Sequence, residues 1–174
     1  MSDLGRLFRF PNPVNEKAAR VVAGGVVILS VAAMALVAVD QGWLLVVIAL
    51  GFWARLLTGP TLSPLGQLAT RVVAPHLGAP KFVAGPPKRF AQAMGVAFSS
   101  TAALLWFGLG ERAAALVVLA LLTVAALLES AFGYCLGCKI FGVLTRVGWI
   151  PDDVCEACND VSLRHPELRK PVAV

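Results

Sequence analysis

The sequence predicts an all-α polytopic membrane protein with four transmembrane helices, an interfacial amphipathic helix and a cysteine-bearing C-terminal tail. Hydrophobic residues make up 58% of its 174 residues and charged residues only 14%, against roughly 45–50% and 25% in soluble domains. The apolar residues form long runs, and the basic residues stand in short clusters between these runs, as in proteins whose loops encode membrane topology. We therefore attribute the net charge of +5 to topology, and we expect no nucleic acid as a partner.

Four apolar runs are the predicted spans. A spanning helix needs about 20 apolar residues; three runs reach this length, and the second does so only if Arg55 extends its side chain to the interface. Short turns at residues 40–42 and 108–112 predict two antiparallel hairpins. The predicted spans are Ala18–Val39, Trp43–Leu57, Phe90–Leu109 and Ala113–Phe132.

The positions of the basic residues predict the orientation. If the N-terminus is inside, 14 of the 15 Lys and Arg residues lie on the inner side and Arg112 alone lies outside. Such a bias places both termini in the cytoplasm. The chain then divides into a cytoplasmic N-terminal segment (1–17), a membrane domain (18–134) and a cytoplasmic tail (135–174).

The inner loop at residues 58–89 predicts a further helix. Five of its apolar residues recur at helical spacing, and they are Leu65, Leu68, Ala69, Val72 and Val73. This helix lies either at the cytoplasmic interface or on the inner end of the bundle. Residues 84–90 read as a stiff turn, in which Lys88 and Arg89 anchor the third span at the lipid headgroups.

The cysteines form two C-x-x-C pairs. Cys135 and Cys138 follow the fourth span directly, and Cys155 and Cys158 come 16 residues later. The predicted topology places all four in a reducing compartment, where metal binding or redox chemistry is more common than structural disulfides. Four incidental buried thiols remain a third interpretation.

The spacing of the two pairs falls in the range of a zinc site. Each pair can direct two thiolates at one ion, so that Cys135, Cys138, Cys155 and Cys158 would complete a tetrahedron. Zinc is the one cofactor that this reading suggests.

Redox chemistry is the alternative. If residues 139–148 are helical, Cys138 lies at the N-terminus of that helix, where the positive end of the helix dipole lowers a thiol pKa. The second pair lies among residues that would raise a thiol pKa, namely Asp152, Asp153 and Glu156. Two neighbouring dithiols can exchange a disulfide, and a cytosolic thioredoxin-like protein is the expected partner.

Glu129 is an acid within the fourth span, one to two turns before Cys135. An ionisable group inside a span indicates function by default. We expect Glu129 either to pair with Arg55 at a similar depth and lock two helices, or to exchange protons with a thiol as a disulfide forms. Tyr134 is either a further group of this site or an interfacial anchor.

Five segments, in this order along the chain, resemble the family called domain of unknown function 4395. They are NPVNEKAAR (12–20), GFWARLLTGPTLSPLGQ (51–67), AGPPKRFAQ (84–92), CLGC (135–138) and CEAC (155–158). The resemblance covers about residues 10–160 and implies a protein of the bacterial cytoplasmic (inner) membrane. It implies no reaction, because the family is named for lacking one.

Three functions follow from these observations. The first is a membrane-embedded thiol–disulfide oxidoreductase or sulfur-handling protein, in which Cys135 and Cys138 exchange disulfides, Cys155 and Cys158 relay them, and Glu129 moves protons. The second is a non-enzymatic membrane protein whose tail is held together by a four-cysteine zinc site. The third is a small transporter, for which the spans offer few polar groups.

Overall fold

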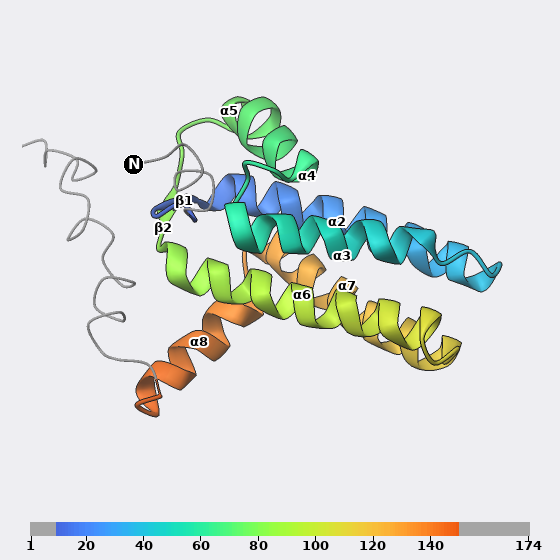
Figure 1. Ribbon diagram of the computed structural model, residues 1–174. Helices are drawn as coiled ribbons and strands as arrows, with labels where there is room; N and C mark the ends of the chain where they lie inside the picture. The colour runs from blue at the N-terminus through green and yellow to red at the C-terminus, as the bar shows by residue number, and fades with distance from the viewer. Residues whose placement is uncertain (1–9, 150–174) are drawn as a thin grey trace, which may run out of the picture.

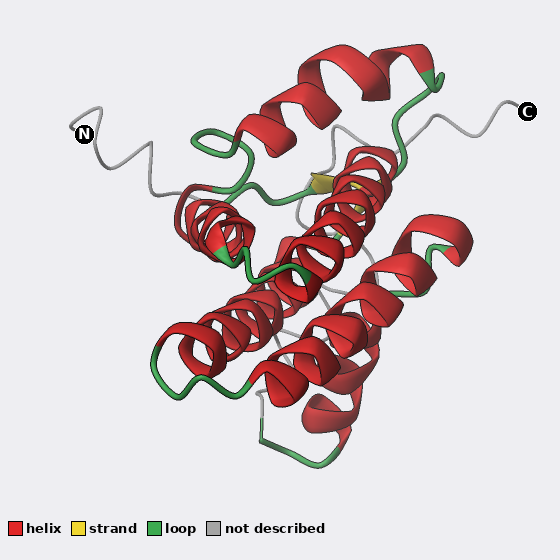
Figure 2. Cartoon of the chain, turned by 90° about the vertical axis from the view of Figure 1, so that its right-hand side faces the viewer, coloured by secondary structure: helices red, strands yellow, loops and turns green. Residues whose placement is uncertain are grey.

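The computed structural model describes residues 10–149, and these residues are predominantly helical, which confirms the all-α class. Four long helices lie side by side (Figures 1 and 2). They form two hairpins, joined at the short turns that the sequence predicts. The four helices are α2 (Glu16–Ala38), α3 (Trp43–Thr58), α6 (Gly85–Phe107) and α7 (Arg112–Phe132).

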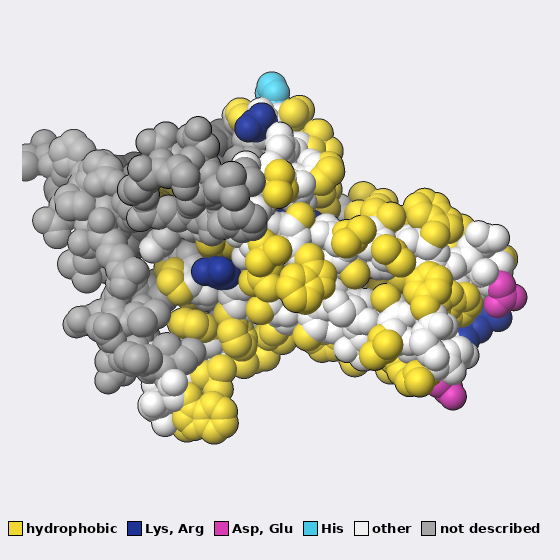
Figure 3. Space-filling model, in the orientation of Figure 1, with side chains coloured by type: hydrophobic (Ala, Val, Ile, Leu, Met, Phe, Trp, Pro, Cys, Tyr) yellow, Lys and Arg dark blue, Asp and Glu magenta, His cyan; other side chains and the backbone are white. Residues whose placement is uncertain are grey.

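Three of these helices, α2, α6 and α7, are long and apolar enough to cross a membrane, whereas α3 has 16 residues and is shorter. Large apolar side chains cover much of the outer surface of the bundle (Figure 3). Soluble monomers rarely expose apolar patches of this extent. Examples that are at least half exposed are Ile28, Leu50, Leu104, Val117 and Leu121.

The core lies between the four helices. Helix α2 packs along α7, α3 packs along α6, and α6 also packs along α7. Side chains of all four helices form this core, and its members include Val26, Val37, Leu45, Phe52, Val96 and Leu119.

Helix α6 begins five residues before the predicted third span. Residues 85–89 form its first turn rather than a turn between elements. Pro86 and Pro87 suit this position, because the first N–H groups of a helix have no partner inside the helix and proline fixes a helical φ.

The inner loop contains the predicted helix, in three continuous pieces: α4 (Pro64–Gln67), the π-helical η1 (Leu68–Val73) and α5 (Ala74–His76). The segment packs on α2, which agrees with the second of the two expected placements. The predicted apolar face is correct only in part: Ala69 is buried as expected, but Leu68 and Val72 are half exposed, and Ala74, outside the predicted set, is buried. The i→i+5 hydrogen bonding of a π-helix brings residues five apart onto one side.

Several short elements gather at the end of the bundle where α2 and α6 begin. We call it the basic end, because Lys17, Arg20, Lys88 and Arg89 lie there. A two-stranded antiparallel ribbon pairs β1 (Val14–Asn15) with β2 (Phe82–Val83). Helix α8 (Leu136–Arg146) packs against α6 at this end, as Figure 1 shows in orange. At the opposite end, Arg112 pairs with Asp40 at 3.2 Å. The basic end therefore brings together the inner loop, at residues 58–89, and the first cysteine pair.

Candidate functional site

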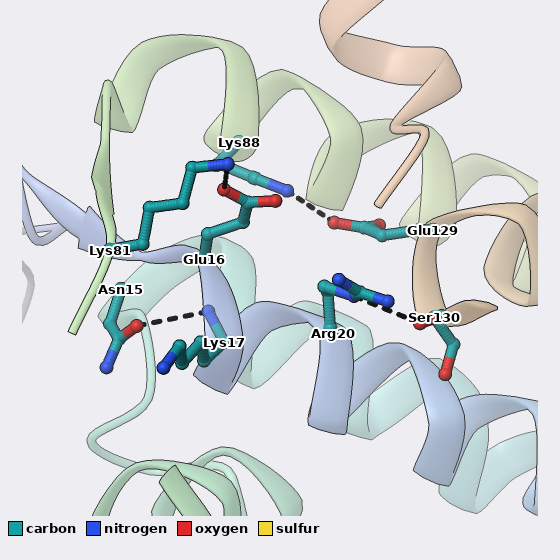
Figure 4. A network of polar contacts seen from close by, with 8 residues as sticks. All are labelled: Asn15, Glu16, Lys17, Arg20, Lys81, Lys88, Glu129 and Ser130. Atoms are coloured by element: carbon teal, nitrogen blue, oxygen red, sulfur yellow. Dashed lines mark hydrogen bonds and ion pairs between the residues drawn. The ribbon is translucent and has the colours of Figure 1, made fainter. Parts of the chain in front are cut away.

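A buried ion pair lies at the centre of the basic end. Lys88 Nζ, in the first turn of α6, is 2.5 Å from Glu129 Oε1, in the last turn of α7. Their side chains are only 9% and 17% exposed, and Figure 4 shows the two pointing toward one another. The expectation that Lys88 anchors the span at the headgroups is therefore wrong, whereas Arg89 is exposed.

The expected pairing of Arg55 with Glu129 is also wrong. Arg55 donates hydrogen bonds to Gln92 Oε1 at 3.0 Å and to Ser63 Oγ at 3.2 Å, and its guanidinium lies 4.4 Å from the centre of the Phe52 ring. The two charges have similar depths, but α3 packs mainly on α6 while α7 packs on α2 and α6. The positions of two residues along their own helices do not determine whether those helices are neighbours.

Helix α7 ends just after Glu129, and the chain turns there toward the cysteines. Gly133 adopts a left-handed φ of 67°, which favours glycine. The Arg20 side chain donates a hydrogen bond to the Ser130 carbonyl at 3.1 Å (Figure 4). It donates a second one to the Ala131 carbonyl at 2.7 Å, so that both acceptors lie in the last turn of α7. This cap holds the end of α7 against α2, and it places Tyr134 and Cys135 beside the ion pair.

Cys135, and not Cys138, lies at the N-terminus of the helix. Helix α8 begins at Leu136 with Cys135 as its N-cap residue, and Cys138 follows one turn later. The prediction that Cys138 opens this helix is therefore wrong, since the helix starts three residues earlier than expected. Cys135 is 7% exposed, Cys138 is partly buried, and both are free thiols.

The two thiols differ in acidity. A hydrogen bond from the Cys138 thiol lowers the pKa of Cys135, and the positive charge of Lys88 lowers it further, against the opposing effects of burial and Glu129. The same hydrogen bond and burial raise the pKa of Cys138. Because the thiolate is the reactive form of a cysteine, Cys135 is the thiol of the pair that ionises more readily.

Gly137 explains how the pair comes so close to α6. A Cβ atom at this position would lie 2.6 Å from both Cα and Cβ of Ala91, a distance that no side chain tolerates. Only glycine lets the start of α8 approach α6 this closely, and that approach brings Cys135 to Lys88. The sequence analysis missed both Gly137 and Lys88; the glycine inside CLGC was the available signal for the first.

Both cysteines line an open cavity of about 380 Å³ at the basic end. Glu16, Lys88, Tyr134 and Lys139 line it as well, and Lys139 Nζ lies 5.5 Å from the centre of the Tyr134 ring. Cys135 and Glu129 also line a smaller, mostly apolar cavity of about 70 Å³ between the helices. A reactant of modest size can therefore approach the thiols from the open side.

The second cysteine pair, Cys155 and Cys158, lies outside the described residues. Within residues 10–149, no group of three or more His, Cys, Asp or Glu residues is placed to hold a metal ion. Cys135 and Cys138 contribute two thiols, half of the four-sulfur set that the spacing predicts, so the zinc site stays a prediction.

Comparisons with known proteins give one match. A family model with the description "Domain of unknown function (DUF4395)" matches residues 14–146, which include all four long helices, the buried ion pair and the first cysteine pair. Neither the curated proteins nor the solved structures contain a match to this chain.

Proposed function

Because the chain belongs to the family described as domain of unknown function (DUF4395), whose name assigns no reaction, we propose its function from the site: a membrane-embedded thiol–disulfide oxidoreductase or sulfur-handling protein. Cys135 and Cys138 form its reactive dithiol. The observation that carries the proposal is the position of Cys135, as N-cap of α8 and one turn from Cys138. The buried Lys88–Glu129 pair beside it supplies a cation and a proton acceptor.

In the first step, the Cys135 thiolate attacks a disulfide of the partner. A bond forms between the Cys135 sulfur and one partner sulfur, the partner disulfide breaks, and the other partner sulfur leaves as a thiolate with the bonding electron pair. Lys88 favours the attacking thiolate through its charge.

In the second step, Cys138 loses its proton to the Glu129 carboxylate and attacks the Cys135 sulfur. The intramolecular disulfide forms, the mixed disulfide breaks, and the second partner thiolate leaves. The dithiol has lost two electrons, the partner disulfide has gained two, and the partner thiolates take up protons from Glu129 and water. The reverse sequence reduces Cys135 and Cys138 again.

The proposed setting is the bacterial cytoplasmic membrane, with four spans and both termini in the cytoplasm. The basic end, which carries the dithiol, then faces the cytoplasm, consistent with the bias of Lys and Arg to the inner side. We propose a cytosolic thioredoxin-like protein as the partner, with Cys155 and Cys158 relaying the disulfide between that partner and the first pair.

A zinc-binding platform is the second candidate. Two thiols one helical turn apart beside an open cavity suit two corners of a tetrahedral site, and Cys155 and Cys158 would supply the others. We do not propose transport, because the buried charged side chains of the described residues, Arg55 and Lys88, gather at the basic end rather than along the bundle.

One preparation separates these candidates. The full chain is purified without oxygen in detergent, its zinc is measured, and its protein thiols are counted before and after treatment with oxidised glutathione, a linear disulfide. In a Cys155→Ser/Cys158→Ser background we expect Cys135 and Cys138 to disappear reversibly as free thiols, no thiol to disappear after Cys135→Ser, and a stable mixed disulfide with glutathione after Cys138→Ser. About one zinc per chain, with thiols that react only after chelation, would instead establish the zinc platform.

A further inference from the structure

Arg55 is a buried cation without a carboxylate partner among the described residues. It is only 6% exposed, and the ion pairs of residues 10–149 do not include it. Its recorded hydrogen bonds use Nε and Nη1, toward Gln92 and Ser63. An arginine has five N–H donors, and Nη2 makes no hydrogen bond within this part of the chain. Nη2 is not among the fully buried unpartnered atoms of the described residues, so it keeps some exposure. A buried charge of this kind is costly unless an anion compensates it.

Arg55 lines an open cavity of about 240 Å³ that has no cysteine in its walls. It adjoins the two cavities beside the cysteines, because it shares Ala19, Val22 and Gln92 with the smaller one and Lys88 with the other. Its walls are largely apolar and include Phe10, Val14, Val22 and Phe82, from the N-terminal segment, α2 and β2. Lys88 lies on the same cavity, whereas Glu129, the acid that neutralises Lys88, does not. The cavity thus combines apolar walls with a net positive end.

We infer that this cavity binds an amphiphile with one anionic head, seated at Arg55, and an apolar chain that lies along the walls. The head is a carboxylate, as in a fatty acid, or a phosphate, as in an acidic phospholipid. Guanidinium groups bind both through paired N–H donors. The cavity is smaller than the roughly 300–1,000 Å³ of a complete ligand pocket and it is open, so only the part of the chain next to the head lies inside.

This site differs from the dithiol in its lining, which includes no cysteine and no residue of α8. The cavity walls come from α2, α3, α4, η1, β1 and β2, and from Lys88 and Gln92 of α6. Lys88 is the charged residue that lines this cavity and also lies beside the cysteine pair. Binding to the proposed site is therefore tested by measurements that leave the redox state of Cys135 and Cys138 unchanged.

The test is the thermal stability of the full chain in a neutral detergent. The probes are oleate, phosphatidylglycerol, inorganic phosphate, and monoolein as the uncharged control. The variants are Arg55→Gln, Val14→Phe, which fills the cavity and keeps Arg55, and Arg71→Gln, which removes an exposed arginine of the same end.

We expect oleate or phosphatidylglycerol to raise the Tm of the wild type and of Arg71→Gln by about 5 °C at a hundredfold excess over Kd. Arg55→Gln and Val14→Phe should show less than about a fifth of this shift. A response to oleate but not to phosphatidylglycerol identifies the carboxylate head, and the converse identifies the phosphate head. The inference is overturned if monoolein or inorganic phosphate alone gives the full shift, or if either cavity variant responds like the wild type; if Arg55→Gln does not fold, Val14→Phe decides.

Discussion

At the scale of single residues, the site depends on alternating charge among Cys135, Lys88 and Glu129. The Lys88 charge favours the Cys135 thiolate, while Glu129 disfavours it and at the same time neutralises Lys88. A thiolate that forms at Cys135 therefore competes with Glu129 for one cation. In the proposed function, the competition between the Cys135 thiolate and the Glu129 carboxylate for Lys88 sets how readily the cysteine pair reacts.

The acidity of the two thiols predicts a pH profile. Since the pKa of Cys135 is lowered, mainly by the Cys138 thiol, its alkylation by iodoacetamide should rise with a midpoint below the ordinary thiol value of about 8.5. Below that midpoint the rate falls tenfold per pH unit with the thiolate fraction. Cys138→Ala removes the hydrogen bond and should move the midpoint upward. The measurement is mass-spectrometric rate mapping in a Cys155→Ser/Cys158→Ser background, and an unchanged midpoint in Cys138→Ala contradicts the assignment.

The ion pair predicts a second set of outcomes. Lys88→Met leaves the Glu129 carboxylate largely buried without a partner, which costs about 3 kcal/mol and should lower the Tm by roughly 10 °C. Lys88→Met/Glu129→Leu removes both charges and should recover most of this loss. Arg89→Met, at the exposed neighbour, should stay within about 0.5 kcal/mol of the wild type. A double variant less stable than Lys88→Met would show that the pair is not the reason for the loss.

The sequence identified one member of this pair and missed the other. Glu129 stands out because it interrupts an apolar run, whereas Lys88 stands beside Arg89 in a cluster typical of a headgroup anchor. Neighbouring residues of a helix point about 100° apart, so one of the two can face the bundle while the other faces outward. Which one does so depends on the rotation of α6 in the bundle, and no local pattern encodes that rotation.

At the scale of elements, the start of α8 is the critical contact. The helix approaches α6 at Gly137 and Ala91, and it adds an edge-to-face contact between the rings of Phe90 and Phe141, 5.8 Å apart. These contacts fix the direction of α8 across the basic end. The cysteine pair is therefore held by packing as well as by its own short turn.

Two glycines of α8 give a matched comparison. Gly137→Ala places a Cβ against the Ala91 backbone, which should cost about 1–3 kcal/mol and speed the alkylation of Cys135 as α8 moves away. Gly142→Ala meets nothing within 4 Å and should add up to about 1 kcal/mol through helix propensity. The Tm and the alkylation rate at one fixed pH measure both effects. Equal behaviour of the two variants would mean that the close approach of α8 to α6 does not matter.

The helices themselves follow from apolar run length, and so do the two hairpins. The buried face of a short helix does not follow from the length of an apolar run. A spacing of 3.6 residues per turn fails where the backbone hydrogen bonds run from i to i+5, as in the π-helix between Leu68 and Val73. The start of α8 was also misplaced: the sequence analysis begins this helix at residue 139, whereas Leu136 to Cys138 already belong to it. Tertiary packing of Gly137 on α6 decides that boundary.

At the scale of the whole molecule, the basic end and the opposite end differ in charge and in complexity. The opposite end has short turns, and Arg112 there pairs with Asp40 and donates a hydrogen bond to the Ala38 carbonyl. The basic end holds the ribbon, the inner-loop helices, α8 and the cavities that Arg55 and the cysteines line. The order of the helices around the bundle could not be read from the sequence, which is why Arg55 was assigned to the wrong partner. The proposed amphiphile site and the proposed dithiol chemistry both lie at the basic end of the four-helix bundle.

The proposed orientation predicts how single cysteines react in intact cells. In a cysteine-free chain, Glu111→Cys, at the turn before α7, should react with a membrane-impermeant maleimide added outside. His76→Cys, at the end of α5, should react only after the membrane is permeabilised. Both native side chains are exposed, so burial does not account for a difference. Labelling of His76→Cys from outside would reverse the orientation and place the dithiol on the other side.

The Arg20 cap on α7 has a consequence for biogenesis. Arg20 and the carbonyl oxygens that it binds are 110 and 111 residues apart, and Lys88 precedes its acid by 41. The ribosome thus delivers Arg20 and Lys88 long before the groups that they contact. A nascent chain that stops before Glu129 lacks the acceptors of both cations, so α7, the last of the four long helices to be synthesised, completes contacts that α2 and α6 begin.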